Sequence, residues 1–167
     1  ATIIQCVDPD PLGQAFGENG VSVARHIFSK YFGSKKLELI KKTLLPFAGK
    51  KPDGSTVLIM RPILEVCQQG VRLVRFHPSR IHTGFRFKGN SNQQEIDALS
   101  TFQEMALKVR IGLPQNSGDI IIVNNHTALH DRGLCSLSLS KNGLSSRISR
   151  ILFINKLNTK ANLNGQD

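Results

Sequence analysis

Two histidines follow a run of apolar residues in the second half of the chain. The stretch GDIIIVNNHTALHDRG spans residues 118–133, with His126 and His130 four residues apart. Neutral imidazole nitrogens are common metal ligands, and two histidines at this spacing on a helix are typical of zinc sites. The stretch lacks the Glu of the HExxH motif, and Gly133 together with the preceding strand argues against a helix. The spacing by itself therefore leaves open whether either histidine binds a metal.

A pair of arginines near the end of the chain can bind an acid. Arg147 and Arg150 begin the last predicted strand. A guanidinium group is a planar fork that binds a carboxylate through two parallel hydrogen bonds. A histidine and an arginine at the mouth of a β-barrel would suit a metal-chelated acid whose far carboxylate is held by the arginine. The alternative is that both arginines are surface charges on the edge of a strand.

Strands are predicted at both ends of the chain and in its middle. They are expected at residues 2–7, 56–64, 71–76, 119–123 and 146–155, from β-branched content and alternation. The run DIIIV at 119–123 is predicted to be fully buried, and residues 81–89 are expected to be extended or looped. The polar side chains at 124–126 would then lie at the rim of a sheet, where ligands enter barrels and jelly rolls.

Three helices are predicted between these strands, at residues 21–32, 35–45 and 92–110. Val23, Ile27 and Tyr31 recur at helical spacing in the first. Ser34 is expected to cap the second, and Pro46 to end it. An apolar stripe typical of a core-facing helix marks the third, which Ser91 or Asn92 can cap.

The order of these elements predicts a mainly antiparallel sheet with helices packed outside it. No glycine-rich phosphate loop follows a strand, and the pattern is not a regular alternation of strand and helix. We expect one domain over residues 1–155 and a polar tail over residues 156–167.

The net charge of +10 is compatible with nucleic acid, an anionic membrane or an acidic ligand as partner. Much of the excess comes from six lysines between residues 35 and 51. Phe47 is the one aromatic residue among them, whereas proteins that stack on single strands interleave several aromatic residues with their basic ones. A solvated, lysine-rich helix is therefore the simpler interpretation, and nucleic-acid binding is the alternative.

The three cysteines lie far apart and in no metal-binding spacing, which favours a reduced, cytoplasmic location. No apolar run approaches the ~20 residues that span a bilayer, so no membrane partner is predicted. The first residues lack the basic and apolar regions of a secretory signal.

The stretch LPQNSGDIIIVNNHTALHDRG resembles the C-terminal motif of the iron(II)/2-oxoglutarate oxygenases of the taurine dioxygenase and clavaminate synthase group. The family pattern is roughly L-x-P-G-D, an apolar strand, D-N-R, three residues and an iron-binding histidine. Asn124-Asn125-His126 stand in the place of D-N-R, and His130 stands in the place of the histidine. Asn125 and His126 would therefore shape the loop or meet the substrate.

The resemblance implies a double-stranded β-helix, or jelly roll, that binds Fe(II) and 2-oxoglutarate. Arg147 would bind the distal carboxylate of 2-oxoglutarate, and Arg150 would be the alternative clamp or a substrate contact. The implied activity is hydroxylase-type oxidation of a C–H bond in a small molecule, with succinate and carbon dioxide as co-products. Substrate and oligomeric state stay open.

The other two iron ligands of this family come as H-x-D or H-x-E, and no such triplet occurs in the chain. The nearest match, His82-Thr83-Gly84, falls well after the expected position. We therefore expect the chain to be the C-terminal part of a longer protein, with a jelly roll incomplete at the N-terminus and the triplet upstream of Ala1. The alternative is a catalytically inactive jelly-roll relative that serves as a binding or scaffold module.

Overall fold

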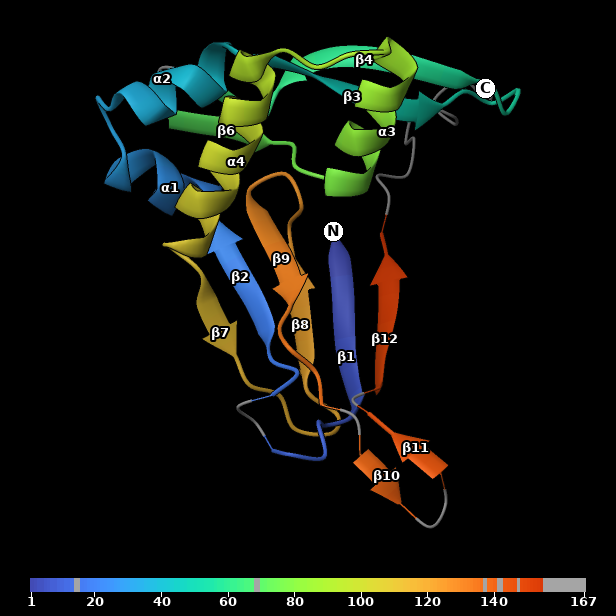
Figure 1. Ribbon diagram of the computed structural model, residues 1–167. Helices are drawn as coiled ribbons and strands as arrows, with labels where there is room; N and C mark the ends of the chain where they lie inside the picture. Colours follow the sequence, from blue (N-terminus) through green and yellow to red (C-terminus); the bar gives the residue numbers. More distant parts are fainter. Residues whose placement is uncertain (14–15, 68–69, 137, 141–142, 147, 155–167) are drawn as a thin grey trace, which may run out of the picture.

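The computed structural model describes residues 1–13, 16–67, 70–136, 138–140, 143–146 and 148–154. Its upper part consists of helices and two hairpins, and its lower part of two small sheets with a third hairpin below them (Figure 1). The strands are β1 Thr2–Asp8, β2 Asn19–Val23, β3 Leu44–Lys50, β4 Thr56–Pro62, β5 Leu64–Cys67, β6 Gly70–Val74, β7 Ile111–Leu113, β8 Ile120–Val123, β9 Ala128–Arg132, β10 Ser138–Ser140, β11 Gly143–Ser145 and β12 Ile148–Phe153. The helices are α1 Ala24–Lys30, α2 Lys35–Lys42, α3 Pro78–Lys88 and α4 Gln93–Leu107.

Two three-stranded antiparallel sheets, in the orders β12-β1-β8 and β7-β2-β9, make up most of the lower part, and the hairpin β10–β11 lies below them. The first sheet places the two ends of the described chain side by side, since the Ala1 ammonium donates to the Ile154 carbonyl at 2.9 Å. Alternation along β1 buries Thr2, Ile4 and Cys6 on one face. Both β9 and β12 pair with a neighbour on one side only within the described residues. The prediction of a mainly β protein with flanking helices is confirmed.

The main hydrophobic core lies in the upper part. Its fully buried members include Ile27 of α1, Leu37 and Ile40 of α2, and Phe102 and Met105 of α4. Burial of side chains of this size is the main source of folding free energy. The core therefore packs the segment between β2 and β7 into one body above the sheets.

The predicted helix at 92–110 is confirmed as α4, and so is its cap. Asn92 Oδ1 accepts a hydrogen bond from the backbone N–H of Glu95, while the Glu95 carboxylate accepts one from the backbone N–H of Asn92. This reciprocal pair is a capping box, which satisfies two amides that the helix itself leaves unpaired.

Glu95 also accepts a hydrogen bond from Lys88 Nζ at 2.6 Å, and its side chain is only 5 % exposed. Burial raises the pKa of the Glu95 carboxyl, but the bonds from Lys88 and the Asn92 amide outweigh it and hold the pKa below its ordinary value. The ionised group therefore stabilises the fold at neutral pH. This contribution is fully present above the ordinary pKa of about 4.5 and disappears as pH falls through the lowered value.

We expect Glu95→Gln to lower stability at pH 7 and to flatten its decline between pH 6 and pH 3. Urea unfolding across this range measures both effects. Asp97→Asn, on the exposed face of the same helix, is the matched control. Parallel pH profiles for the wild type and the Glu95→Gln variant would contradict the assignment.

Two of the predicted helices have different boundaries in the structure. Residues 21–23 belong to strand β2, and α1 begins only at Ala24. Ser34 caps α2 as predicted, its Oγ accepting from Leu37 N at 3.2 Å. That helix ends at Lys42, however, and Pro46 lies inside β3. A proline fits there because β3 is bonded only to β4 within the described residues, which leaves its other edge unpaired.

The prediction that residues 81–89 are extended or looped is wrong. They belong to α3, which has Pro78 in its first turn and ends at Gly89 in the left-handed region at φ 86°. Gly84 brings this helix directly onto β3, since a Cβ there would overlap the backbone of Pro46. Tertiary packing therefore selects the helix.

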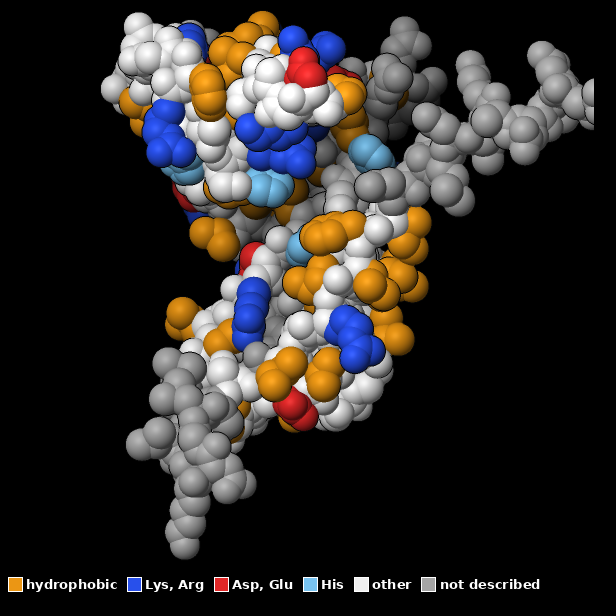
Figure 2. Space-filling view, turned by 90° about the vertical axis from the view of Figure 1, so that its right-hand side faces the viewer, with side chains coloured by type: hydrophobic (Ala, Val, Ile, Leu, Met, Phe, Trp, Pro, Cys, Tyr) orange, Lys and Arg blue, Asp and Glu red, His pale blue; other side chains and the backbone are white. Residues whose placement is uncertain are grey.

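The prediction that DIIIV is fully buried is also wrong. Ile120 and Ile122 are 57 % and 69 % exposed, whereas Val123 is 3 % exposed. Strand alternation places the two exposed isoleucines on the outer face of the sheet, where Leu152 of β12 is 55 % exposed. Apolar side chains gather over the lower part of the molecule when it is viewed from the β12 side (Figure 2).

The lysine-rich segment lies largely on α2, and three of its six lysines bind acids on the surface. Glu38 binds Lys41 and Lys42, and Lys36 binds Glu104. These pairs favour the solvated helix over a nucleic-acid surface. Within the part of the chain that the structure describes, no helix has the length and apolarity needed to cross a membrane.

Candidate metal centre

His130 lies in the middle of β9, an edge strand of the lower sheet β7-β2-β9. Residues directly opposite one another on antiparallel strands share a face of the sheet. His130 therefore lies on one face with its partner Val21, and Leu129 lies on the other face with Ser22. The hydroxyl of Ser22 donates to the Ala106 carbonyl of α4 at 2.8 Å, so the His130 face points away from α4.

The imidazole of His130 is half-buried and makes no hydrogen bond within the described residues. Burial lowers the pKa of His130, and the negative charge of Asp131 offsets this only in part. A lowered pKa keeps the ring neutral near pH 7, which is the form that coordinates metals. His130 is therefore suited to supply one ligand.

A cavity of about 410 Å³ lies between β9 and α4. Its lining is Ser22, Phe76, Gln103, Ala106, Leu107, Leu129, His130 and Asp131. The strand backbone at His130 borders this cavity, since alternation directs the imidazole to the other face.

The turn before β9 is held by asparagines. The Asn124 carbonyl accepts from the backbone N–H groups of Thr127 and Ala128 at 3.0 and 2.9 Å, and Asn124 Oδ1 accepts from His126 N at 3.1 Å. Asn125 Nδ2 donates to Thr2 Oγ1 at 2.7 Å, and Thr2 is fully buried. The turn is thereby fixed to β1 of the other sheet, which explains locally why the two asparagines follow the strand.

The remaining predicted site residues do not gather around His130. His126 is exposed in the turn. Arg150 is exposed on β12 opposite Gln5, whereas the next residue pair, Ser149 and Cys6, lies on the buried face. Arg147 lies outside the described residues. His82, the nearest match to the missing triplet, is exposed on α3.

No group of three or more His, Cys, Asp or Glu side chains in the described part of the chain lies close enough to hold a metal ion. The described residues therefore fit an iron centre at one position only, through the neutral and unbonded imidazole of His130.

One residue beside the candidate ligand was missed by sequence reasoning. Arg110 binds both oxygens of Asp131 through Nε at 3.1 and 3.0 Å, and Glu18 through Nη1 at 2.5 Å. Its side chain is 19 % exposed, and the bonds to Asp131 and Glu18 raise the pKa of Arg110 above its ordinary value. Gly20 leaves room for this cluster, because a Cβ there would overlap the guanidinium and the Asp131 carboxylate.

Asp131 is the neighbour of His130, so the Arg110 cluster fixes the strand that carries the candidate ligand. No spacing or motif marks these three residues, which lie at positions 18, 110 and 131. The pairing Gly20↔Asp131 in β2 and β9 brings them together.

Comparison with solved structures identifies the fold. An asparagine oxygenase in complex with Fe(II), 2S,3S-3-hydroxyasparagine and succinate superposes with a TM-score of 0.65 at 14% identity, covering 90% of this chain. This chain shares its fold with non-heme iron oxygenases. The oxygenase OrfP superposes with TM-scores of 0.52 with Fe and alpha-ketoglutaric acid and 0.55 with Fe, succinate and (3R,4R)-dihydroxy-L-Arg, at 14% and 13% identity and 90% coverage of this chain.

The chain spans less than half the length of these oxygenases, covering 44% of the asparagine oxygenase and 43% and 46% of the two OrfP chains. No family model and no curated protein matches the sequence. The comparison therefore bears on the fold, and the predicted roles of His130, Asn125, His126, Arg147 and Arg150 stay predictions.

Proposed function

We propose that this chain is the C-terminal part of an iron(II)- and 2-oxoglutarate-dependent oxygenase that oxidises a C–H bond of a small molecule. The observation that carries the proposal is the position of His130. Its neutral imidazole lies half-buried on an edge strand of a fold shared with iron oxygenases. In the sequence, it also stands where the taurine dioxygenase-like motif has its distal iron ligand.

The two lower sheets are, in this proposal, six strands of a double-stranded β-helix. β9 and β12 each have one edge without a partner among the described residues, and unpaired edges are where further strands add. Strands from outside these 167 residues would complete both sheets. They would also bring the missing His and carboxylate to the iron, as a facial triad requires.

Each residue of this chain then has a proposed role. His130 binds the metal, and Asn125 holds the preceding turn against β1 through Thr2. Because Arg150 lies on the exposed face of β12, we assign the clamp on the distal carboxylate of 2-oxoglutarate to Arg147. For Arg150 and His126 we propose contacts with the substrate or with the loop. When bound, iron(II) with 2-oxoglutarate supplies an oxidation coupled to decarboxylation, with succinate and carbon dioxide as co-products.

The test uses the natural polypeptide that contains these residues, purified and loaded anaerobically with Fe(II). Two of the neighbouring structures contain a hydroxylated amino acid, 2S,3S-3-hydroxyasparagine in one and (3R,4R)-dihydroxy-L-Arg in the other, so the first substrates to screen are free amino acids. We expect succinate release that depends on iron, 2-oxoglutarate and oxygen. A folded polypeptide that neither binds iron nor releases succinate would contradict the proposal and favour the binding or scaffold relative.

A further inference from the structure

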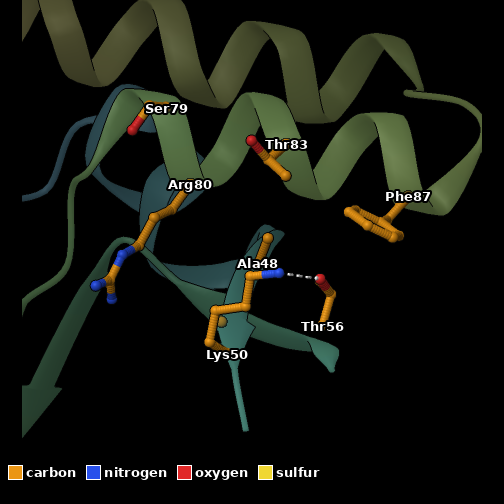
Figure 3. A pocket seen from close by; sticks show the side chains of 8 residues that line it. Ala48, Lys50, Thr56, Ser79, Arg80, Thr83 and Phe87 are labelled. Carbon is orange, nitrogen blue, oxygen red and sulfur yellow. Dashed lines mark hydrogen bonds between the residues drawn. The ribbon is translucent and has the colours of Figure 1, made fainter. Parts of the chain in front are cut away.

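A second cleft lies in the upper part, between α3 and the hairpin β3–β4 (Figure 3). It has a volume of about 540 Å³, within the range of small-molecule sites. Its lining is Ala48, Gly49, Lys50, Thr56, Ser79, Arg80, Thr83 and Phe87. We call it the α3–β3 cleft.

The local structure explains why these side chains meet. Ser79, Thr83 and Phe87 follow one another at intervals of four and therefore share one face of α3. Lys50 and Thr56 are directly opposite in the β3–β4 pair and share a face of the hairpin. The close approach of α3 to β3 at Gly84 brings the two faces together.

The α3–β3 cleft is positively charged, because Lys50 and Arg80 line it and none of the described residues that line it is acidic. Within the described residues, Lys50 Nζ donates to two neutral oxygens, Thr56 Oγ1 and the Gly54 carbonyl, each at 3.3 Å. Arg80 has no ion pair within the described part of the chain, in contrast to Lys88, which is paired with Glu95. Lys and Arg side chains also gather on the upper part of the molecule in Figure 2.

The polar groups are matched by an apolar surface at the far end of the cleft. Phe87 is 62 % exposed and lies at the opposite end of α3 from Ser79 and Arg80. Thr83 lies between them, and its hydroxyl has no hydrogen-bond partner among the described residues. The N-terminus of α3 adds a partial positive charge near Ser79, but the full charges come from Lys50 and Arg80.

We propose that the α3–β3 cleft binds a small organic phosphate monoester that carries an aromatic or other apolar group. A phosphate monoester offers three terminal oxygens and up to two negative charges, which match Arg80, Lys50 and the hydroxyls of Ser79 and Thr83. A carboxylate has two oxygens and one charge, so it would leave some of these cations and hydroxyls without a partner. The apolar group of the ligand would lie on Phe87.

The experiment uses the natural polypeptide that contains these residues, purified without iron, and measures binding of phenyl phosphate by isothermal titration calorimetry. We expect saturable 1:1 binding that weakens with added salt. Inorganic phosphate, which lacks the ring, and phenylacetate, which lacks the phosphate, should each bind more weakly. Because iron is absent, failure here leaves the proposed oxygenase function untouched, and failure of that function leaves this site untouched.

Variants test the residues. Arg80→Gln should weaken phenyl phosphate binding about tenfold or more, as expected for loss of a charged hydrogen bond. Arg86→Gln, on the same helix but outside the cleft lining, should change it less than about twofold. Phe87→Ala should remove the preference for phenyl phosphate over inorganic phosphate. Absence of saturable binding, tighter binding of phenylacetate, or equal effects of the two arginine variants would each overturn the proposal.

Discussion

Substitution of His130 by alanine is expected to abolish iron- and 2-oxoglutarate-dependent succinate release by the natural polypeptide. Loss of a residue that only supports a metal ligand typically costs ~10–100-fold in activity or metal affinity. Loss of a ligand itself should exceed this range. His130 is assigned as the ligand because, among the described residues of the lower sheets, it alone combines partial burial, a lowered pKa and an imidazole without a hydrogen bond.

His82→Ala is the control. His82 is exposed on α3 and has no role in the proposed metal site. Unfolding curves for both variants separate loss of a ligand from loss of the fold. Succinate release by a folded His130→Ala variant at more than a few per cent of the wild-type rate would contradict the assignment of His130.

Substitution of Arg110 by methionine is expected to destabilise the fold by about 2 kcal/mol. Methionine keeps much of the length of the side chain and removes its charge. Glu18 and Asp131 would then remain close together without the cation that both contact at 2.5–3.1 Å. Removing one partner of a fully buried pair costs ~3–5 kcal/mol. The expected value is lower here because Asp131 is 45 % exposed and water screens it in part.

Urea unfolding measures this change, with Lys108→Met as the control. Lys108 also binds an acid, Glu104 at 2.7 Å, but both side chains are about half exposed, so its loss should matter far less. Because Asp131 adjoins His130, the Arg110→Met variant should also weaken iron binding by the natural polypeptide. Equal unfolding midpoints for the two methionine variants would show that the Arg110 cluster does not hold β9.

Elements with strong local signals could be predicted from the sequence. The apolar stripe and the Asn92 cap define α4, and alternation with β-branched residues defines the first and last strands. The exclusion of a helix at HTALH was also right, and it places His130 on a strand. These signals come from residues that are close together in the sequence, so they do not depend on how the rest of the chain packs.

Other elements depend on contacts between distant residues. Val23 shares a helical spacing with Ile27 and Tyr31, yet it pairs with Ala128 of β9 and belongs to β2, because β-branched residues are favourable in strands. The glycine at position 84 lowers the helix propensity of IHTGFRF, but that glycine is what allows α3 to rest on Pro46. Strand alternation also exposes Ile120 and Ile122, which a run of isoleucines does not reveal.

The residues of the candidate site also fall into those that the sequence could predict and those that it could not. His130, Asn125 and the turn between β8 and β9 form one continuous segment, and the resemblance identified it. Arg110, Glu18 and Asp131 are brought together only by the pairing of β2 with β9, so no sequence pattern predicted them. The α3–β3 cleft likewise requires a helix and a hairpin that the sequence does not place together.

The most direct test of the central claim is an anomalous diffraction map of the natural polypeptide, crystallised anaerobically with Fe(II) and 2-oxoglutarate. We expect an iron peak at about 2.1 Å from an imidazole nitrogen of His130, the usual metal–imidazole distance. We also expect the remaining protein ligands to come from outside these 167 residues. An iron peak remote from His130 in a polypeptide that still releases succinate would contradict it.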